Sequence, residues 1–304
     1  MDLQEKILKL KIEKNAIILA HYYVDEDLQK IADFVGDSLQ LSQEAAKTDA
    51  DIIVFVAVNF MAETAKILSP NKKVLLPDIE AGCSLSDSCP TKDFSEFIKK
   101  YENHTVISYI NTTAEIKALS DIIVTSSNAK DVVEKLPKHE KIIFGPDKNL
   151  GSYINSITGR NMVLWDGACH VHKRFDLKKI LELKKQNPNA KIIAHPECEK
   201  NILLVADFIG STAAMLNFTK IDFADTYIVV TETGILFKMR TESPNKNFIP
   251  APPTDETCSC NDCSYMKLNT LEKLYDCLKN EKPEIILSEE IIFKARKSLD
   301  RMLL

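Results

Sequence analysis

Five of the eight cysteines in this 304-residue chain lie where they could bind a metal or exchange electrons. Cys258, Cys260 and Cys263 fall within six positions in the stretch TCSCNDCSYM, and Cys83 and Cys169 lie far upstream, in DIEAGCSLSDSC and WDGACHVH. The C-terminal trio has no fourth cysteine or histidine beside it, whereas a structural zinc site closes with four ligands. The trio is therefore a local redox element, an incomplete zinc site, or one part of a larger cluster with distant ligands.

The remaining cysteines, Cys89, Cys198 and Cys277, are interpreted as packing residues. Unpaired cysteine is among the most frequently buried residue types. Eight cysteines in a chain of this length are also too few for a disulfide scaffold, so free thiols or metal ligands are expected.

The composition excludes several classes of protein. A net charge of −5 and an isoelectric point near 5.8 argue against a large nucleic-acid-binding surface. No apolar run reaches the roughly 18 residues that a membrane span needs. The first stretch, MDLQEKILKLKIEKN, is amphipathic and charged, unlike a signal peptide. We expect a soluble, cytoplasmic protein that binds neither nucleic acid nor membrane.

Three stretches of the chain align with one another, and each opens with a short apolar run typical of a buried strand. They read IILAHYYVDEDLQKIADFVGDS, VISYINTTAEIKALSDIIVTS and IIAHPECEKNILLVADFIGST. The apolar runs end at His21, Tyr109 and His195, which are 88 and 86 residues apart. The chain therefore contains three copies of one unit.

Further positions recur at fixed distances from these strand ends. Two residues on come Tyr23, Asn111 and Glu197; twelve residues on come Asp33, Asp121 and Asp207; seventeen residues on come Ser38, Ser126 and Thr212. The aspartates close a helix and precede a strand, so we interpret them as structural.

The elements that must position these residues alternate between strand and helix, which favours parallel sheets covered by helices. We predict an α/β fold of three similar three-layer α/β/α domains with parallel sheets, arranged with pseudo-threefold symmetry around a central cluster and active site. The predicted domains are residues 1–83 plus 264–304, residues 84–170, and residues 171–263.

Ligands of open parallel sheets bind beyond the carboxyl ends of the strands, where His21, Tyr109 and His195 lie. We expect the hydroxyls of Ser38, Ser126 and Thr212 at helix starts, where such side chains cap the first turn and backbone N–H groups bind anions. If the three helix starts face inward, together they would bind a small substrate with several carboxylate or phosphate groups. Taken singly, each hydroxyl is more often only a cap, and each histidine only structural.

The cysteines follow the repeat as well. Cys83 lies 62 residues after its strand end and Cys169 lies 60 residues after its own, whereas Cys258, Cys260 and Cys263 lie 63, 65 and 68 residues after theirs. One thiolate from each copy suits an iron–sulfur cluster with one open iron better than a structural zinc site. By spacing alone, Cys258 is the favoured third ligand.

These residues resemble the quinolinate synthase family, iron–sulfur enzymes of de novo NAD biosynthesis. The resemblance covers nearly the whole chain and includes PDIEAGCSLSDSC, SYINTTAEIKALSD, FGPDKNLG, HPEC, GSTAAM and CNDCSYMKLNTL. It implies a transferase with a 4Fe–4S cluster held by Cys83, Cys169 and Cys263, the last because it adjoins SYMKLNTL. It also implies condensation of iminoaspartate with dihydroxyacetone phosphate to quinolinate, releasing phosphate and two waters, with the open iron as Lewis acid.

The resemblance also implies a set of substrate residues, of which only His172 was not marked by the repeat. The set is His21, Tyr23, Ser38, Tyr109, Asn111, Ser126, His172, His195, Glu197 and Thr212. Tyr23 and Glu197 are candidates for proton transfer, and His21 and Tyr109 complete the catalytic group. An L-aspartate oxidase or dehydrogenase is the implied supplier of iminoaspartate.

Two other functions fit the same residues. A hydro-lyase with aconitase-like chemistry would use the cluster without needing a phosphate site. A metal or redox sensor would use only the C-terminal trio of cysteines, so its metal content would not depend on Cys83 or Cys169.

Overall fold

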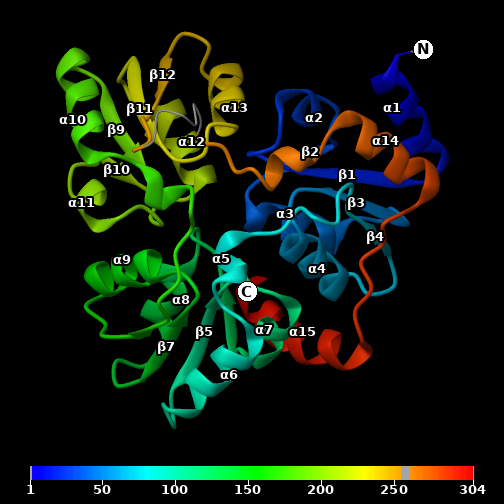
Figure 1. Cartoon of the computed structure of the whole chain (residues 1–304), viewed down its shortest axis with the longest axis horizontal. Coiled ribbons are helices and arrows are strands. Elements are labelled where there is room, and N and C mark those ends of the chain that lie inside the picture. The colour runs from blue at the N-terminus through cyan, green and yellow to red at the C-terminus, as the bar shows by residue number, and fades with distance from the viewer. Residues whose placement is uncertain (1, 255–260, 304) are drawn as a thin grey trace.

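The computed structural model describes residues 2–254 and 261–303, so Cys258 and Cys260 lie outside the described residues. The chain forms three domains, each built on a four-stranded parallel sheet. In Figure 1 the domains form three lobes, coloured blue, cyan to green, and green to yellow along the chain. The predicted three-domain α/β fold is confirmed.

The three sheets share one strand order. The first contains β1 (Ala16–His21), β2 (Phe34–Gly36), β3 (Ile52–Val56) and β4 (Lys73–Leu75); the second contains β5 (Thr105–Tyr109), β6 (Ile122–Val124), β7 (Ile142–Gly145) and β8 (Val163–Leu164); the third contains β9 (Lys191–Ala194), β10 (Phe208–Ile209), β11 (Thr226–Val230) and β12 (Asn247–Pro250). The orders are β2-β1-β3-β4, β6-β5-β7-β8 and β10-β9-β11-β12, which confirms the repeat.

The helices follow the same plan. The first domain has α1 (Leu3–Glu13), α2 (Glu26–Ile31), α3 (Ser38–Lys47) and α4 (Asn59–Leu68); the second has α5 (Ser84–Asp87), α6 (Thr91–Lys99), α7 (Ala114–Leu119), α8 (Ala129–Lys135) and α9 (Lys148–Thr158); the third has the 3-10 helix η1 (His172–Arg174), α10 (Leu177–Gln186), α11 (Lys200–Leu203), α12 (Thr212–Ile221) and α13 (Ile235–Glu242). The 3-10 helix η2 (Met266–Leu268), α14 (Leu271–Asn280) and α15 (Glu289–Leu303) complete the chain.

The strands are apolar because both faces of each sheet are covered. All five residues of β3, reading IIVFV, are buried. Such continuous apolar runs are typical of parallel strands packed between two helix layers. Because parallel strands point the same way, the carboxyl ends of β1 and β3 open at the same edge of their sheet.

The repeated aspartates are structural, as predicted. In each domain the Asp carboxylate accepts the N–H of a residue in the first strand, at 2.8 Å, and the Asp N–H donates to the carbonyl of that same residue. The pairs are Asp33 with Ile18, Asp121 with Val106, and Asp207 with Ile192. Each aspartate therefore fastens the start of its second strand to the first strand.

The C-terminal helices return to the first half of the chain. Helix α14 packs against α1 in the first domain, whereas α15 lies against α4 of the first domain and against α7 and β6 of the second. One apolar cluster runs through both domains and these helices. Two further clusters lie mainly in the third domain, and one of them includes Tyr22 of the first domain. The exact domain limits stay a prediction. Among the described residues, no helix combines the length and apolar character needed to cross a bilayer.

Candidate active site

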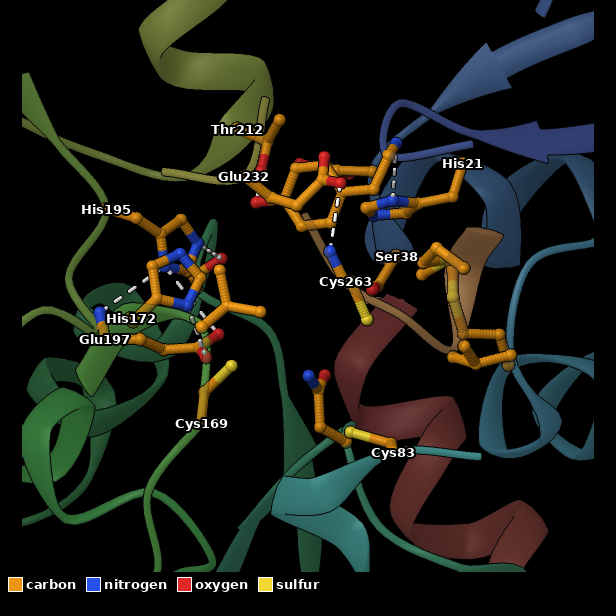
Figure 2. Close-up of a pocket in the computed structure, with 18 of the residues that line it drawn as sticks. His21, Ser38, Cys83, Cys169, His172, His195, Glu197, Thr212, Glu232 and Cys263 are labelled. Carbon is orange, nitrogen blue, oxygen red and sulfur yellow. Dashed lines mark hydrogen bonds and ion pairs between the residues drawn. The ribbon is translucent and has the colours of Figure 1, made fainter. Parts of the chain in front are cut away.

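A single pocket lies where the carboxyl ends of the three sheets face one another (Figure 2). The thirteen residues singled out from the sequence all line it: His21, Tyr23, Ser38, Cys83, Tyr109, Asn111, Ser126, Cys169, His172, His195, Glu197, Thr212 and Cys263. They come from strand ends, helix starts and connecting loops of all three domains. The structure therefore brings together residues up to 242 positions apart in the chain.

The two strand-end histidines are held in the same way. The Nδ1 of His21 accepts the backbone N–H of Tyr23 at 3.2 Å, and the Nδ1 of His195 accepts the backbone N–H of Glu197 at 3.3 Å. Because a backbone N–H can only donate, the ring proton of each neutral histidine lies on Nε2. In His195 this nitrogen lies 3.3 Å from the Ser126 hydroxyl.

Both histidines are neutral at physiological pH. Burial lowers the pKa of His21 and of His195 to about 3, although the nearby Glu197 carboxylate opposes this shift. A histidine can offer an anion either a hydrogen bond or, when protonated, a positive charge. The environment of His21 and His195 favours the hydrogen bond, because the charged form is disfavoured by desolvation.

Glu197 is the centre of a buried network. Its Oε1 accepts a 2.6 Å hydrogen bond from the Tyr109 hydroxyl, and its Oε2 lies 3.2 Å from Nδ1 of His172. Burial alone would raise the pKa of Glu197, but His172, His195 and the Tyr109 hydrogen bond outweigh it and hold the pKa below the usual range. Burial and the Glu197 charge raise the pKa of Tyr109 well above its usual value. Glu197 is thus ionised and Tyr109 protonated.

Tyr23 joins the same network through a threonine. The Tyr23 hydroxyl lies 2.9 Å from both the Thr212 and the Thr231 hydroxyls, and the Thr231 hydroxyl lies 2.9 Å from Nε2 of His172. Burial raises the pKa of Tyr23 well above its usual value, so its hydroxyl retains the proton. A continuous chain of polar contacts therefore runs from Tyr23 through Thr231 and His172 to Glu197.

The helix starts differ from the prediction in one respect. Ser38 and Thr212 are the first residues of α3 and α12, but the caps are the preceding residues: Asp37 accepts the N–H groups of Leu39 and Gln40, and Ser211 accepts that of Ala214. The predicted capping role of Ser38 and Thr212 is therefore wrong. Since Asp37 and Ser211 cap the helices, the hydroxyls of Ser38 and Thr212 instead line the pocket.

Ser126 also differs, because α8 begins only at Ala129 and its cap position is Asn128. Ser126 therefore lies in the turn before the helix. The neighbouring Ser127 hydroxyl lies 2.9 Å from the Asp37 carboxylate, to which it can donate, and 2.8 Å from the Ser211 hydroxyl. The three helix starts, one from each domain, thus meet in one hydrogen-bonded junction beside the pocket.

The three pocket cysteines come from three different loops and are free thiols. Figure 2 shows the sulfurs of Cys83, Cys169 and Cys263 turned toward the same space. Burial raises the pKa of Cys83 to about 12 and that of Cys263 to about 11, and it raises the pKa of Cys169 well above its usual value. The protein alone therefore keeps these groups as thiols, and a bound metal centre is what would hold them as thiolates.

The other described cysteines are buried away from this space. Cys89, Cys198 and Cys277 are each almost fully buried, and the Cys198 thiol donates to the carbonyl of Val230. The pocket thus contributes three sulfur donors from the described residues, one from each part of the repeat. This donor set fits an iron–sulfur cluster with three protein ligands.

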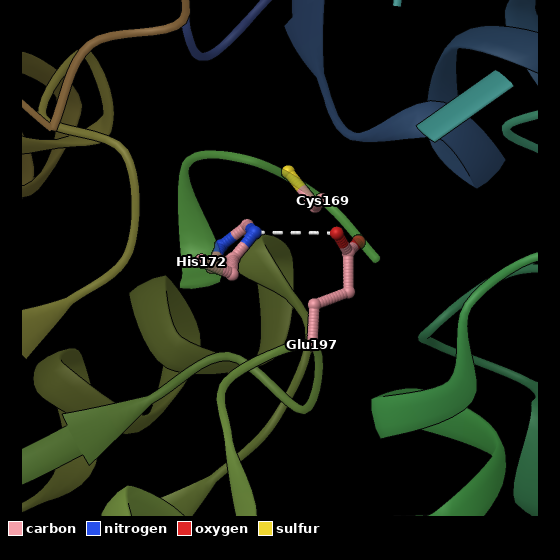
Figure 3. Close-up of side chains that lie close together, drawn as sticks. All are labelled: Cys169, His172 and Glu197. Carbon is pink, nitrogen blue, oxygen red and sulfur yellow. Dashed lines mark ion pairs between the residues drawn. The ribbon is translucent and has the colours of Figure 1, made fainter. Parts of the chain in front are cut away.

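A second group could also hold a metal ion. Ligand atoms of Cys169, His172 and Glu197 lie within 4.8 Å of one another. Figure 3 shows the three side chains gathered together. In this group His172 and Glu197 already pair with each other, and Tyr109 also bonds Glu197. The carboxylate and imidazole are therefore engaged in the polar network.

Among the residues that sequence reasoning missed, three are buried and hydrogen-bond to residues of the pocket. Thr231, Glu232 and Asp147 are at most 1% exposed and follow the third strand of their sheets. Burial raises the pKa of Glu232 to about 8, against the effect of Lys267 and two backbone N–H groups. A signal was present, because Asp147 lies 38 residues after Tyr109 and Glu232 lies 37 residues after His195.

The fold and the pocket define an enzyme: three α/β domains enclosing a buried acid–base network beside three thiols. The family model described as "Quinolinate synthetase A protein" matches residues 5–304. Proteins named quinolinate synthase from Chloroherpeton thalassium and Thermosynechococcus vestitus are each 58% identical over 303 residues, covering 100% of this chain and 94% and 95% of theirs. One from Synechocystis is 59% identical over 302 residues, covering 99% of this chain and 95% of its own. The chain belongs to the quinolinate synthase family.

Proposed function

We propose that this chain condenses iminoaspartate with dihydroxyacetone phosphate to give quinolinate, phosphate and two waters. The supporting observation is the single pocket that combines hydroxyls, neutral histidines, an ionised carboxylate and protonated tyrosines. This set can bind two small anions and also move protons between them.

Cys83, Cys169 and Cys263 would hold a 4Fe–4S cluster, one per chain. When bound, the cluster supplies an iron without a cysteine ligand, which can act as a Lewis acid toward substrate oxygen. The chemistry of the donor set supports this assignment, because the three free thiols face one space and come one from each domain.

The hydroxyls of Ser38, Ser126 and Thr212 would bind the carboxylate and phosphate oxygens of the substrates. His21 and His195 would add hydrogen bonds from Nε2, since their Nδ1 atoms already accept backbone N–H groups. The Oδ1 of Asn111 is buried and has no hydrogen-bond partner among the described residues. Such an unsatisfied pocket atom is suited to bind a substrate N–H or O–H group.

Proton transfer would fall to the two ends of the buried network. The ionised Glu197 carboxylate can accept a proton, and the Tyr109 hydroxyl, hydrogen-bonded to it, can return one. Tyr23, held by Thr212 and Thr231 at the other end of the network, can also donate a proton. Because an imine hydrolyses in water, the reaction also requires domain closure around the substrates.

The substrate iminoaspartate would come from an L-aspartate oxidase or dehydrogenase acting in the same compartment, which we expect to be the cytoplasm. Iminoaspartate is short-lived, so the test generates it within the assay. The reconstituted chain, a purified L-aspartate oxidase, L-aspartate and dihydroxyacetone phosphate are incubated without oxygen, together with an organic electron acceptor that reoxidises the oxidase while the imine forms.

We expect quinolinate and phosphate to appear in equal amounts, and both to disappear when dihydroxyacetone phosphate is omitted. Phosphate release separates this reaction from that of an aconitase-like hydro-lyase, which needs no phosphate ester. Absence of quinolinate from a chain that carries its full complement of iron would overturn the proposal.

A further inference from the structure

Two buried carboxylates beside the pocket are not used by the proposed reaction. Asp147 and Glu232 are both 0% exposed and follow the third strand of the second and third domains, two residues after β7 and β11 end. They therefore occupy matching places in two copies of the repeat. A fully buried carboxylate is costly unless its oxygens are hydrogen-bonded, so the partners of each are informative.

Asp147 divides its two oxygens between a helix and a cysteine. Its Oδ1 accepts the N–H of Leu150 at 2.7 Å, which caps the start of α9. Its Oδ2 lies 3.3 Å from the backbone nitrogen of Cys169 and accepts that N–H. One rigid side chain thus connects the end of β7, the start of α9 and the loop that carries the second cysteine.

In the third domain, the two oxygens of Glu232 likewise bond to a helix start and to a cysteine. Its Oε2 accepts the N–H of Gly234 at 2.7 Å, just before α13, and its Oε1 accepts the backbone N–H of Cys263 at 3.2 Å. The ammonium group of Lys267 lies 3.7 Å from Oε1 and also pairs with Asp25 of the first domain at 3.0 Å. Figure 2 shows the Glu232 carboxylate bonded to the Cys263 nitrogen.

In the first domain, a backbone hydrogen bond makes the equivalent connection between the segment after the third strand and the cysteine loop. Asn59, which lies 38 residues after His21, donates its backbone N–H to the carbonyl of Ala81 at 2.7 Å, two residues before Cys83. In all three domains, therefore, the segment after the third strand is hydrogen-bonded to the cysteine loop. Only in the second and third domains is the bond made by a side chain to the cysteine itself.

We propose that Asp147 and Glu232 are matched positioning residues that fix Cys169 and Cys263 for binding the iron–sulfur cluster. This inference rests on the proposed function, because it assumes that these cysteines are cluster ligands. A cysteine whose N–H is held has a fixed backbone, so its sulfur is pre-oriented before the cluster binds. Outer residues of this kind commonly change metal affinity by about 10- to 100-fold when altered.

Substitution by serine separates the two bonds of Asp147. In Asp147→Ser the hydroxyl can still cap α9, because serine is a favoured cap residue, but it is too short to reach Cys169 as well. Glu232→Gln keeps the shape of the side chain and leaves only one oxygen for its two N–H partners. The matched control is Asp176→Ser, since Asp176 caps α10 through Lys178 and Lys179.

The experiment follows iron loss from the reconstituted, full-length proteins after addition of a ferrous chelator without oxygen. We expect Asp147→Ser and Glu232→Gln to release iron about tenfold faster than the unaltered protein, and Asp176→Ser to match it. The unfolding temperature of each apoprotein is measured in parallel, so that faster iron release can be separated from a general loss of stability.

Release at the unaltered rate in both variants would overturn the inference. It would also be overturned if release accelerated only in proportion to a lower unfolding temperature, or equally in Asp176→Ser, because the carboxylates would then be ordinary structural residues. Failure of the unaltered chain to take up iron would instead contradict the proposed function.

Discussion

Tyr109 and Glu197 share a 2.6 Å hydrogen bond at the centre of the pocket, and their protonation states are opposite. The ionised carboxylate is stabilised by His172 and by the Tyr109 hydrogen bond, while the tyrosine holds its proton because both burial and Glu197 disfavour its anion. Such a pair can pass a proton to and from a bound substrate without water.

Replacing either member of this pair should abolish turnover without removing the cluster. We expect Tyr109→Phe and Glu197→Gln to lower kcat by about 10²- to 10⁴-fold, the usual contribution of a positioned acid or base. Iron content should equal that of the control Tyr153→Phe, which alters a tyrosine of α9 outside this pocket. Loss of iron in Glu197→Gln would instead assign the metal to Cys169, His172 and Glu197.

The buried histidines predict how stability depends on pH. The pKa of His21 is lowered to about 3 in the folded apoprotein, whereas in the unfolded chain it is about 6.5. Between these values the unfolded state binds more protons, so the folded state loses stability as the pH falls below about 6.5. His21 alone should contribute a loss of about 2 kcal/mol between pH 7 and pH 5.

Urea unfolding of the apoprotein at several pH values tests this contribution. In His21→Asn the difference in unfolding free energy between pH 7 and pH 5 should be smaller by about 2 kcal/mol, since the titrating group is gone. His139→Asn serves as control, because His139 is exposed. An unchanged difference in His21→Asn would show that this histidine is already charged in the folded protein.

Among the elements, the first two strands of each domain are tied together by one aspartate. The carboxylate of Asp207 accepts the N–H of Ile192, as Asp33 and Asp121 do in their own domains. Removing the acceptor leaves a backbone N–H of the sheet without its partner. We expect Asp207→Ala to lower the free energy of unfolding by about 1–3 kcal/mol, and the exposed Asp49→Ala to leave it nearly unchanged. Equal values for the two variants would contradict this structural role.

The repeat predicted these elements well because its offsets record where strands end. His21, Tyr109 and His195 lie at or just beyond the ends of β1, β5 and β9, and the aspartates act as expected. The offsets could not decide which residue caps a helix. Asp37 and Ser38, like Ser211 and Thr212, are both favoured cap types, and only the backbone angles decide between them. Spacing also favoured Cys258, whereas the structure brings Cys263 into the pocket and does not describe Cys258.

Residues whose role is to position other side chains are harder to predict from the sequence. Asp147 and Glu232 lie at similar offsets from Tyr109 and His195, but the sequence does not show that their carboxylates contact Cys169 and Cys263. Thr231 was missed because a threonine at a strand end has no special pattern. Its place between Tyr23 and His172 follows from how two domains meet, which a single sequence does not record.

For the whole molecule, the pocket exists only because three domains meet. The first and second domains share a continuous apolar core with the C-terminal helices, whereas the third domain has two separate clusters, one of which includes Tyr22 of the first domain. Contacts of the third domain with the others include the polar groups at the pocket, such as Ser211 with Ser127 and Thr212 with Tyr23. No single domain holds more than part of the proposed cluster site.

The most direct test of this account measures iron and sulfide in the protein purified without oxygen, beside single cysteine variants. We predict a brown protein with about four iron and four sulfide per chain, and loss of both in Cys83→Ser, Cys169→Ser and Cys263→Ser. The buried Cys89→Ser and Cys277→Ser controls, and Cys258→Ser and Cys260→Ser, should retain the cluster. A colourless zinc protein, or full iron content in Cys83→Ser or Cys169→Ser, would contradict a cluster held by one cysteine from each domain.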